Sequence, residues 1–166
     1  MICGIDPGID GALALLDRAG NALDVVDMPT IKVRIGGTLR ARVDPHGLRG
    51  KLLEWAPAHV VLEEIAPRKG DGARAVVLGI AFGQAEGVVV GLGLPLVLAS
   101  PREWRRQTGV SADSYDGRKA QSLIVARNLF PGMAVNLKAA AHADRAEALL
   151  LARWGLKARA LGMVAA

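Results

Sequence analysis

Acidic side chains stand at positions along this chain from which several of them could hold a metal ion together. Asp6 follows a short apolar run at residues 2–5 and comes directly before Pro7 and Gly8. Proline cannot donate to a strand ladder and glycine permits a sharp turn, so the run is predicted to be a strand that ends at Asp6. Because ligands in α/β sheets bind beyond the carboxyl ends of strands, Asp6 is a candidate metal ligand. An ordinary Asp-Pro-Gly turn explains this stretch equally well.

A second pair of acids, Glu63 and Glu64, ends an apolar run at residues 59–64. This run is predicted to be a strand parallel to the first one, with its carboxyl end on the same side of the sheet. Successive strand residues point to opposite faces, so only one of the two glutamates can share a face with Asp6. The alternative is that both belong to a solvated strand end.

Two more acids, Asp144 and Glu147, lie three residues apart in the first turn of a helix predicted at residues 143–159. That spacing puts both carboxylates on one side of the helix. The same Asp-x-x-Glu pattern is also that of a capping box. Only tertiary folding can bring this pair to the acids that end the two strands.

Such a set of carboxylates suits the hydrolysis of a phosphodiester. Two divalent ions roughly 4 Å apart can clamp the attacking and leaving oxygens of an in-line displacement. A site of Asp and Glu without Cys fits Mg²⁺ or Mn²⁺ rather than zinc, because Mg²⁺ prefers oxygen ligands. Carboxylates alone would repel a nucleic acid, so positive side chains must flank them, and the candidates are Arg68, Lys69, Arg74, Arg118 and Lys119.

The charge balance favours an anionic partner. The chain has 21 basic and 16 acidic residues, a formal net charge of +5, and nucleic acid is the usual partner of a basic protein. A merely soluble basic protein has the same balance. The length predicts one domain, residues 1–166. Cys3 is the only cysteine and the N-terminus has no signal-peptide pattern, so we expect an intracellular, cytoplasmic protein.

The order of predicted elements is that of an α/β fold. Short connections join the first three strands into an antiparallel meander, whereas helical crossovers make the fourth and fifth strands parallel to the first. The result is a mixed five-stranded sheet flanked by helices. The strands are predicted at residues 2–5, 11–16, 22–28, 59–64 and 94–99, and the helices at 45–56, 73–92, 101–108, 117–129 and 143–159.

Residues 29–43 form a basic stretch that contains two glycines and no clear period. We predict a mobile loop or an irregular edge there. Contact with phosphate is the functional interpretation, and a solvated surface loop is favoured over it.

The helix at residues 73–92 carries a stripe of glycines spaced four residues apart, which places them on one helix face. Each glycine costs roughly 1 kcal/mol relative to alanine in a helix interior, so we expect another backbone to pack there. We favour packing within the chain for at least half of the stripe, with the same helix of a second copy as an alternative. Glu86 is the only charge in residues 75–100 and lies near the middle, so a buried helix is favoured over a membrane span. The stripe comprises Gly79, Gly83, Gly87 and Gly91.

Taken together, these segments resemble the RuvC-type Holliday-junction resolvases, members of the ribonuclease H-like superfamily. The resemblance covers nearly the whole chain and rests on the order and spacing of several motifs rather than on any one of them. The motifs are Gly4-Ile-Asp-Pro-Gly8, Val61-Leu-Glu-Glu64, Gly83-Gln-Ala-Glu-Gly87, Pro101-Arg-Glu-Trp-Arg-Arg-Gln107, Arg118-Lys-Ala-Gln121 and Asp144-Arg-Ala-Glu-Ala-Leu-Leu-Leu-Ala152.

The resemblance implies a homodimeric, Mg²⁺-dependent endonuclease that nicks four-way junctions and other branched DNA, with no role at a membrane. It implies two ions in each active site, for which Mn²⁺ substitutes, and a dimer contact through the long helix. The family's metal ligands correspond to Asp6, Glu63, Asp144 and Glu147, and Lys119 corresponds to the basic residue near the scissile phosphate. The side chains expected to bind DNA are Arg68, Lys69, Arg74, Arg105, Arg118 and Lys119.

The sequence departs from the family pattern at two places. Glu147 stands where an aspartate is usual, although its longer side chain should still reach a metal. The loop at residues 65–74 has no aromatic side chain that could wedge into a junction. His142, just before the last two acids, either assists the metal or a water or only flanks the start of the helix.

Two other functions are compatible with these residues. The first is a ribonuclease H-like nuclease that acts on RNA or on flaps. The second is a protein that binds branched DNA without cutting it, although uncompensated carboxylates beside DNA would only weaken such binding.

Overall fold

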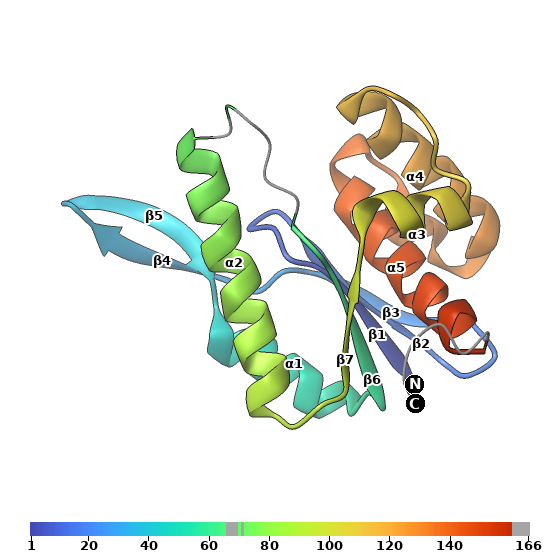
Figure 1. Cartoon of the computed structure of the whole chain (residues 1–166), viewed down its shortest axis with the longest axis horizontal. Coiled ribbons are helices and arrows are strands. Elements are labelled where there is room, and N and C mark those ends of the chain that lie inside the picture. The colour runs from blue at the N-terminus through green and yellow to red at the C-terminus, as the bar shows by residue number, and fades with distance from the viewer. Residues whose placement is uncertain (66–69, 71, 161–166) are drawn as a thin grey trace.

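The computed structural model describes residues 1–65, 70 and 72–160, and its centre is a five-stranded sheet (Figure 1). The strands follow one another across the sheet in the order β3-β2-β1-β6-β7. β1 therefore lies in the middle, where apolar layers cover both of its faces. The strands are β1 (Ile2–Asp6), β2 (Ala12–Leu16), β3 (Ala22–Asp27), β6 (His59–Glu63) and β7 (Leu96–Ala99).

The pairing of the strands agrees with the sequence prediction. β1 pairs antiparallel with β2, and β2 pairs antiparallel with β3. β6 runs parallel to β1, and β7 runs parallel to β6. The mixed five-stranded sheet is confirmed, and the structure adds a second sheet of two strands to it.

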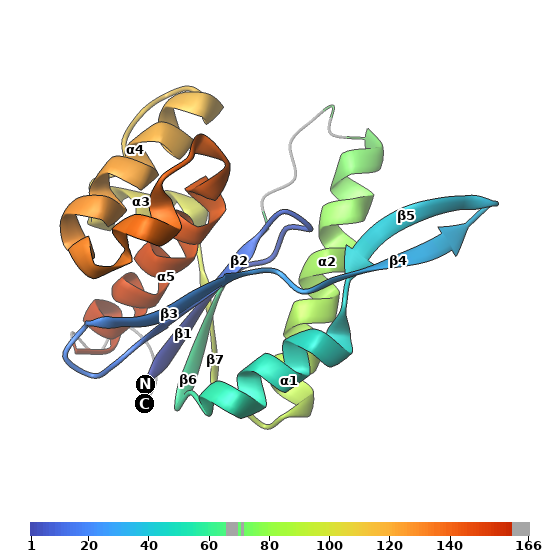
Figure 2. The same cartoon turned by 180° about the vertical axis from the view of Figure 1, so that it is seen from behind.

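Helices cover both faces of the sheet (Figures 1 and 2). One face packs against α1 (Pro45–Trp55) and α2 (Gly72–Gly91), and the other packs against α3 (Pro101–Thr108), α4 (Tyr115–Leu129) and α5 (Ala143–Ala160). Two 3₁₀ segments, η1 (Pro131–Leu137) and η2 (Ala140–His142), join α4 to α5. Every residue of β1 and β2 is buried between these layers.

Gly4 allows α5 to lie directly on β1. A Cβ at this position would overlap the α5 backbone at Ala148 and Ala152. At the other end of the contact, a Cβ at Gly155 would overlap the side chain of Val61 on β6. This close approach brings the first turns of α5 to the carboxyl end of β1, which is the arrangement that the predicted site requires.

The expected loop at residues 29–43 is a β-hairpin instead. Its strands are β4 (Thr30–Ile35) and β5 (Thr38–Val43), paired antiparallel in continuous register. Gly36 and Gly37 form the turn with φ values of 54° and 80°, which glycine adopts without a steric penalty. The alternation of Ile31, Val33 and Ile35 with basic residues is the period-two signal that predicts such a strand.

The expectation that the glycine stripe of α2 packs within the chain is wrong. Among the described residues, no atom lies within 4 Å of a Cβ built at Gly79, Gly83, Gly87 or Gly91. The helix packs on the sheet through a different face, which contains Ala81, Ala85 and Val89. The stripe therefore belongs to the outer surface of α2.

α2 also stands out because it is apolar and mostly exposed. In the described part of the chain it is the one helix long and apolar enough to cross a membrane, with a mean hydropathy of 1.5 and 17% of its window buried. Val76 and Val90 are exposed by 63% and 60%. Contiguous apolar surface of this kind marks an interaction site, and the absence of a membrane role stays a prediction.

Candidate metal centre

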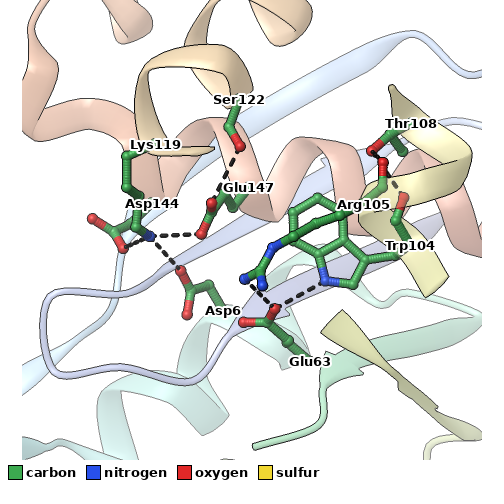
Figure 3. A network of polar contacts seen from close by, with 9 residues as sticks. All are labelled: Asp6, Glu63, Trp104, Arg105, Thr108, Lys119, Ser122, Asp144 and Glu147. Carbon is green, nitrogen blue, oxygen red and sulfur yellow. Dashed lines mark hydrogen bonds and ion pairs between the residues drawn. The ribbon is translucent and has the colours of Figure 1, made fainter. Parts of the chain in front are cut away.

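Three carboxylates from two elements surround the ammonium group of Lys119 (Figure 3). Asp6 ends β1, Asp144 and Glu147 lie in the first turns of α5, and each offers an oxygen within 4.8 Å of the others. Lys119 Nζ is 2.6 Å from Glu147 Oε2, 2.7 Å from Asp144 Oδ1 and 3.7 Å from Asp6 Oδ2. The three acids are therefore arranged to bind a cation.

Burial and neighbouring groups hold these acids in place. Asp6 is 7% exposed and Glu147 is 2% exposed. The hydroxyl of Ser122, one turn after Lys119 on α4, donates to Glu147 Oε1 over 3.2 Å. Arg145 ties the start of α5 to β3 through two bonds to the carboxylate of Asp27, 2.5 and 2.6 Å long. The site is thus assembled by the sheet, α4 and α5 together.

The fourth predicted ligand, Glu63, lies in the same cleft but is bound by other partners. Its Oε1 accepts from Trp104 Nε1 over 2.9 Å and from Arg105 Nη2 over 2.8 Å (Figure 3). It does not belong to the group formed by the other three acids. Glu64, the next residue, is exposed. Arg105, predicted to bind DNA, therefore holds a carboxylate in this structure.

Acidic and basic side chains share one open cleft with a volume of about 330 Å³. Arg118 lines it and donates to the backbone oxygen of Asp113 over 2.6 Å. Arg74 lines it from the start of α2 and stacks on the ring of Tyr115 at 5.9 Å. The predicted DNA contacts Arg68 and Lys69 lie outside the described residues. The four acids and the basic residues Arg74, Arg105, Arg118 and Lys119 all line this cleft.

His142 takes part in the entry to α5 rather than in the acid cluster. Its Nδ1 accepts from the backbone N–H of Ala139 over 3.3 Å, at the end of η2. It does not line the cleft, and it is not part of the described group that could hold a metal. The structure favours the second of the two roles considered for it.

Sequence reasoning missed three residues of the site. Trp104 is fully buried and fixes Glu63, Ser122 is fully buried and fixes Glu147, and Tyr115 stands exposed at the cleft beside Lys119. Ser122 and Tyr115 could have been found from their helical spacing of three and four residues to Lys119. No local pattern pairs Trp104 with Glu63, because the two are joined only by the fold.

The gathered charges shift the ionisation of the site. Burial raises the pKa of Asp6 well above its usual range, and the negative charge of Glu63 raises it further. Burial also raises the pKa of Glu63, although the charge of Arg105 opposes this effect. Burial alone would lower the pKa of Lys119, but the charges of Asp6 and Glu147 more than offset it and raise this pKa. The carboxylates thus carry an energetic cost that a bound cation relieves.

The residues present fit a hard divalent cation. All donors in the group are carboxylate oxygens, which Mg²⁺ and Mn²⁺ prefer. Lys119 Nζ already fills the space among them with a positive charge. The coarser prediction of an acidic site able to hold a metal is supported, whereas the identity and number of the ions belong to the proposal below.

The affinity for Mn²⁺ is expected to fall as the pH is lowered, beginning above the range in which ordinary aspartates titrate. Metal binds the ionised carboxylates, but the raised pKa values of Asp6 and Glu63 mean that protons occupy them at a higher pH than about 3.9, the ordinary value for Asp. Affinity therefore rises as the pH increases through these raised values and levels off above them. Calorimetric titrations between about pH 5 and about pH 8 measure it, and a constant affinity would contradict the shifts.

Replacing Glu63 by glutamine is expected to slow metal-dependent cleavage of DNA by more than about ten-fold, whereas Glu64→Gln leaves it unchanged. The two changes are chemically identical and adjacent, but only Glu63 lies in the cleft with the other acids. Single-turnover rates of the two variants provide the comparison. Equal effects would show that the face of the strand is irrelevant.

The fold is shared with solved structures of junction resolvases. Thermus thermophilus RuvC matches with a TM-score of 0.57 and 19% sequence identity, over 97% of this chain and 96% of that one. T. thermophilus RuvC in complex with a Holliday junction substrate matches with a TM-score of 0.56 and 18% identity, over 96% and 95%. Fowlpox virus resolvase, in a complex with substrate Holliday junction DNA, matches with a TM-score of 0.54 and 16% identity, over 95% and 99%.

No protein-family model and no curated protein matches the sequence. At these identities the structural likeness shows a common fold across nearly the whole chain, and the chemistry has to be argued from the site itself.

Proposed function

We propose that this protein is a metal-dependent endonuclease of the ribonuclease H-like fold that cuts branched DNA, chiefly four-way junctions. The observation that carries the proposal is the cluster of Asp6, Asp144 and Glu147 around a positive charge in an open cleft. Its support is the fold shared with two resolvase structures that contain Holliday junctions.

The three clustered acids and Glu63 are the proposed ligands of two Mg²⁺ ions, for which Mn²⁺ substitutes. When bound, the ions supply an activated water and neutralise the leaving oxygen of the phosphodiester. The protein contributes rigid placement, because Asp6 ends a central strand and Glu147 is buried and bonded by Ser122. Such pre-organisation is what allows charged groups to act without rearranging during the reaction.

The basic side chains of the cleft are the proposed contacts to the DNA backbone. Arg74 and Arg118 flank the acids, and Tyr115 lies beside Lys119 at 5.7 Å from its ring centre. These groups offset the repulsion between DNA phosphates and the carboxylates. The same side chains allow Lys119 to reach a phosphate at the reaction centre.

The test is a comparison of substrates in Mg²⁺: an immobile four-way junction, a three-way junction, a flap, a linear duplex and an RNA–DNA hybrid. We expect the four-way junction to be cut fastest, by paired nicks in opposed strands. Preferential cutting of the hybrid or the flap would support the alternative nuclease activity. Tight binding of the junction without cutting in Mg²⁺ or Mn²⁺ would support the non-catalytic alternative.

We further propose that the protein acts as a homodimer through the outer face of α2. Two copies related by a two-fold axis present one site to each of two opposed strands. The face contains Val76, Ile80 and Val90 together with exposed glycines of the stripe, which permit close approach of a second backbone. α2 has a single acid and a single base, so charge repulsion does not oppose such a contact.

A double variant, Val76→Glu with Ile80→Glu, is expected to be monomeric where the unmodified protein is a dimer. Two carboxylates on an apolar contact face would have to be buried without partners, which costs several kcal/mol. Light scattering coupled to gel filtration measures the mass. Ile124→Glu, an equally exposed apolar position on α4, is the control and should remain dimeric. A monomeric unmodified protein, with and without junction DNA, would contradict this interface.

A further inference from the structure

The β4–β5 hairpin projects from the body of the protein beside α2 (Figures 1 and 2). Each strand has six residues, so the arm is about 20 Å long. Its base is fixed, because Val43 is buried in the core and the N–H of Asp44 donates to the oxygen of Pro29 over 2.8 Å. The rest of the arm is mostly exposed, and the proposed chemistry in the cleft makes no use of it.

The arm carries a concentrated positive charge. Four of its residues are basic, and residues 29–43 contain no acid. In the part of the chain that the structure describes, no ion pair joins any of the four to a carboxylate. Arg34 donates instead to the oxygen of Gly37 over 3.0 Å, across the turn. The four side chains are Lys32, Arg34, Arg40 and Arg42.

The strand register distributes these charges over both faces of the ribbon. Arg42 and Arg40 lie opposite Ile31 and Val33 on one face, because directly paired residues share a face. Lys32 and Arg34 lie opposite Ala41 and Leu39 on the other face. A ribbon charged on both faces can neutralise phosphates whichever face meets a duplex, and a two-stranded ribbon also fits the major groove.

We infer that the β4–β5 hairpin is a second DNA-contacting element, which binds the phosphate backbone of a duplex arm of branched DNA outside the acidic cleft. The inference rests on the proposed function and extends it. A branched substrate has several arms, and a contact beside α2 would hold an arm other than the strand that enters the cleft. Because phosphates are the ligands, the contact is independent of DNA sequence.

A second copy of the chain is the competing occupant of the arm. The exposed residues Ile31, Ile35 and Leu39 would suit a protein surface. The proposed dimer face on α2, however, offers Glu86 as its only acid to four cations. The excess of unpaired positive charge therefore favours DNA over a subunit contact.

The test compares two variants with the same net charge. The first replaces Lys32, Arg34, Arg40 and Arg42 by glutamine. The second replaces four basic residues of the β2–β3 turn, α1 and the last turns of α5 by glutamine, at the end of the molecule opposite the cleft: Arg18, Arg49, Arg153 and Lys157. A fluorescent immobile four-way junction is titrated in EDTA between about 50 and about 200 mM salt.

We expect the hairpin variant to bind the junction roughly ten- to a hundred-fold more weakly at the lower salt, with a salt dependence reduced by two to four phosphate contacts, about 0.9 in slope for each. The control variant should stay within about three-fold of the unmodified protein. Cleavage at saturating enzyme in Mg²⁺ should be unchanged in both variants, because the hairpin does not line the cleft. The pair Arg34→Gln with Arg40→Gln, both exposed, provides a milder variant if the first fails to fold.

Three results would overturn the inference. Equal weakening in both variants would mean that net charge alone matters. A hairpin variant that binds the junction normally, while the unmodified protein shows tight binding, would exclude the arm without affecting the proposed function. A hairpin variant that becomes monomeric would place the arm in a subunit contact. If the unmodified protein binds no junction at all, the proposed function fails and the inference fails with it.

Discussion

Replacing Asp6 by asparagine is expected to abolish metal-dependent cleavage of a four-way junction, with a loss of at least about a thousand-fold in the single-turnover rate. Changes to groups that only support a metal ligand cost about ten- to a hundred-fold, so loss of a ligand itself should cost more. Asp6 has no substitute, because the strand ends there and Pro7 follows. Single-turnover cleavage in Mg²⁺ and in Mn²⁺ measures the effect.

Binding should be preserved in this variant. Asparagine keeps the shape of the side chain and removes one negative charge near the DNA, so affinity for the junction should stay equal or increase. Glu54→Gln on α1, an exposed carboxylate far from the cleft, controls for the change of charge. A variant that still cuts at the normal rate would remove Asp6 from the reaction and return it to a turn-forming role.

Replacing Lys119 by methionine is expected to have opposite effects on metal binding and on cleavage. The ammonium group occupies the space among three carboxylates, so its removal eliminates a competitor and Mn²⁺ should bind several-fold more tightly. Cleavage should fall roughly a hundred-fold, because a positive group near the scissile phosphate is lost. Calorimetry and single-turnover kinetics on the same preparation separate the two effects.

The same variant should depend on metal for its stability. Removal of one partner from a buried ion pair costs about 3 kcal/mol, because the remaining charges are left uncompensated. The midpoint of thermal unfolding should therefore fall in EDTA and recover when Mn²⁺ is added. Lys157→Met, exposed near the end of α5, should show neither effect. Weaker metal binding in Lys119→Met would instead show that the ammonium group is needed to assemble the acids.

The elements of the sheet were predictable because their signals are local. Short connections after the first two strands dictate an antiparallel meander, and a helical crossover makes the fourth strand parallel. Asp44 followed by Pro45 predicted the start of α1, where the Asp44 side chain accepts from the N–H of His46. The hairpin at residues 30–43 was predictable too, since apolar and basic residues alternate on both sides of Gly36 and Gly37, but its charge suggested a loop.

The remaining features depend on tertiary contacts that no spacing encodes. The four-residue period of the α2 glycines fixes their face but does not say what covers it. The pattern at the end of β6 allows one glutamate to face Asp6, yet only the fold shows that Trp104 and Arg105 bind Glu63. The position of Lys119 among the acids likewise requires α4 and α5 to be packed together.

The most direct test of the proposed metal site is a crystal structure of the protein grown with Mn²⁺, with anomalous diffraction used to locate the ions. The account predicts two manganese peaks among Asp6, Glu63, Asp144 and Glu147, with the ammonium group of Lys119 displaced from its present place between the last two. A structure in saturating Mn²⁺ that shows no peak in the cleft, and Lys119 still bound to the carboxylates, would contradict it.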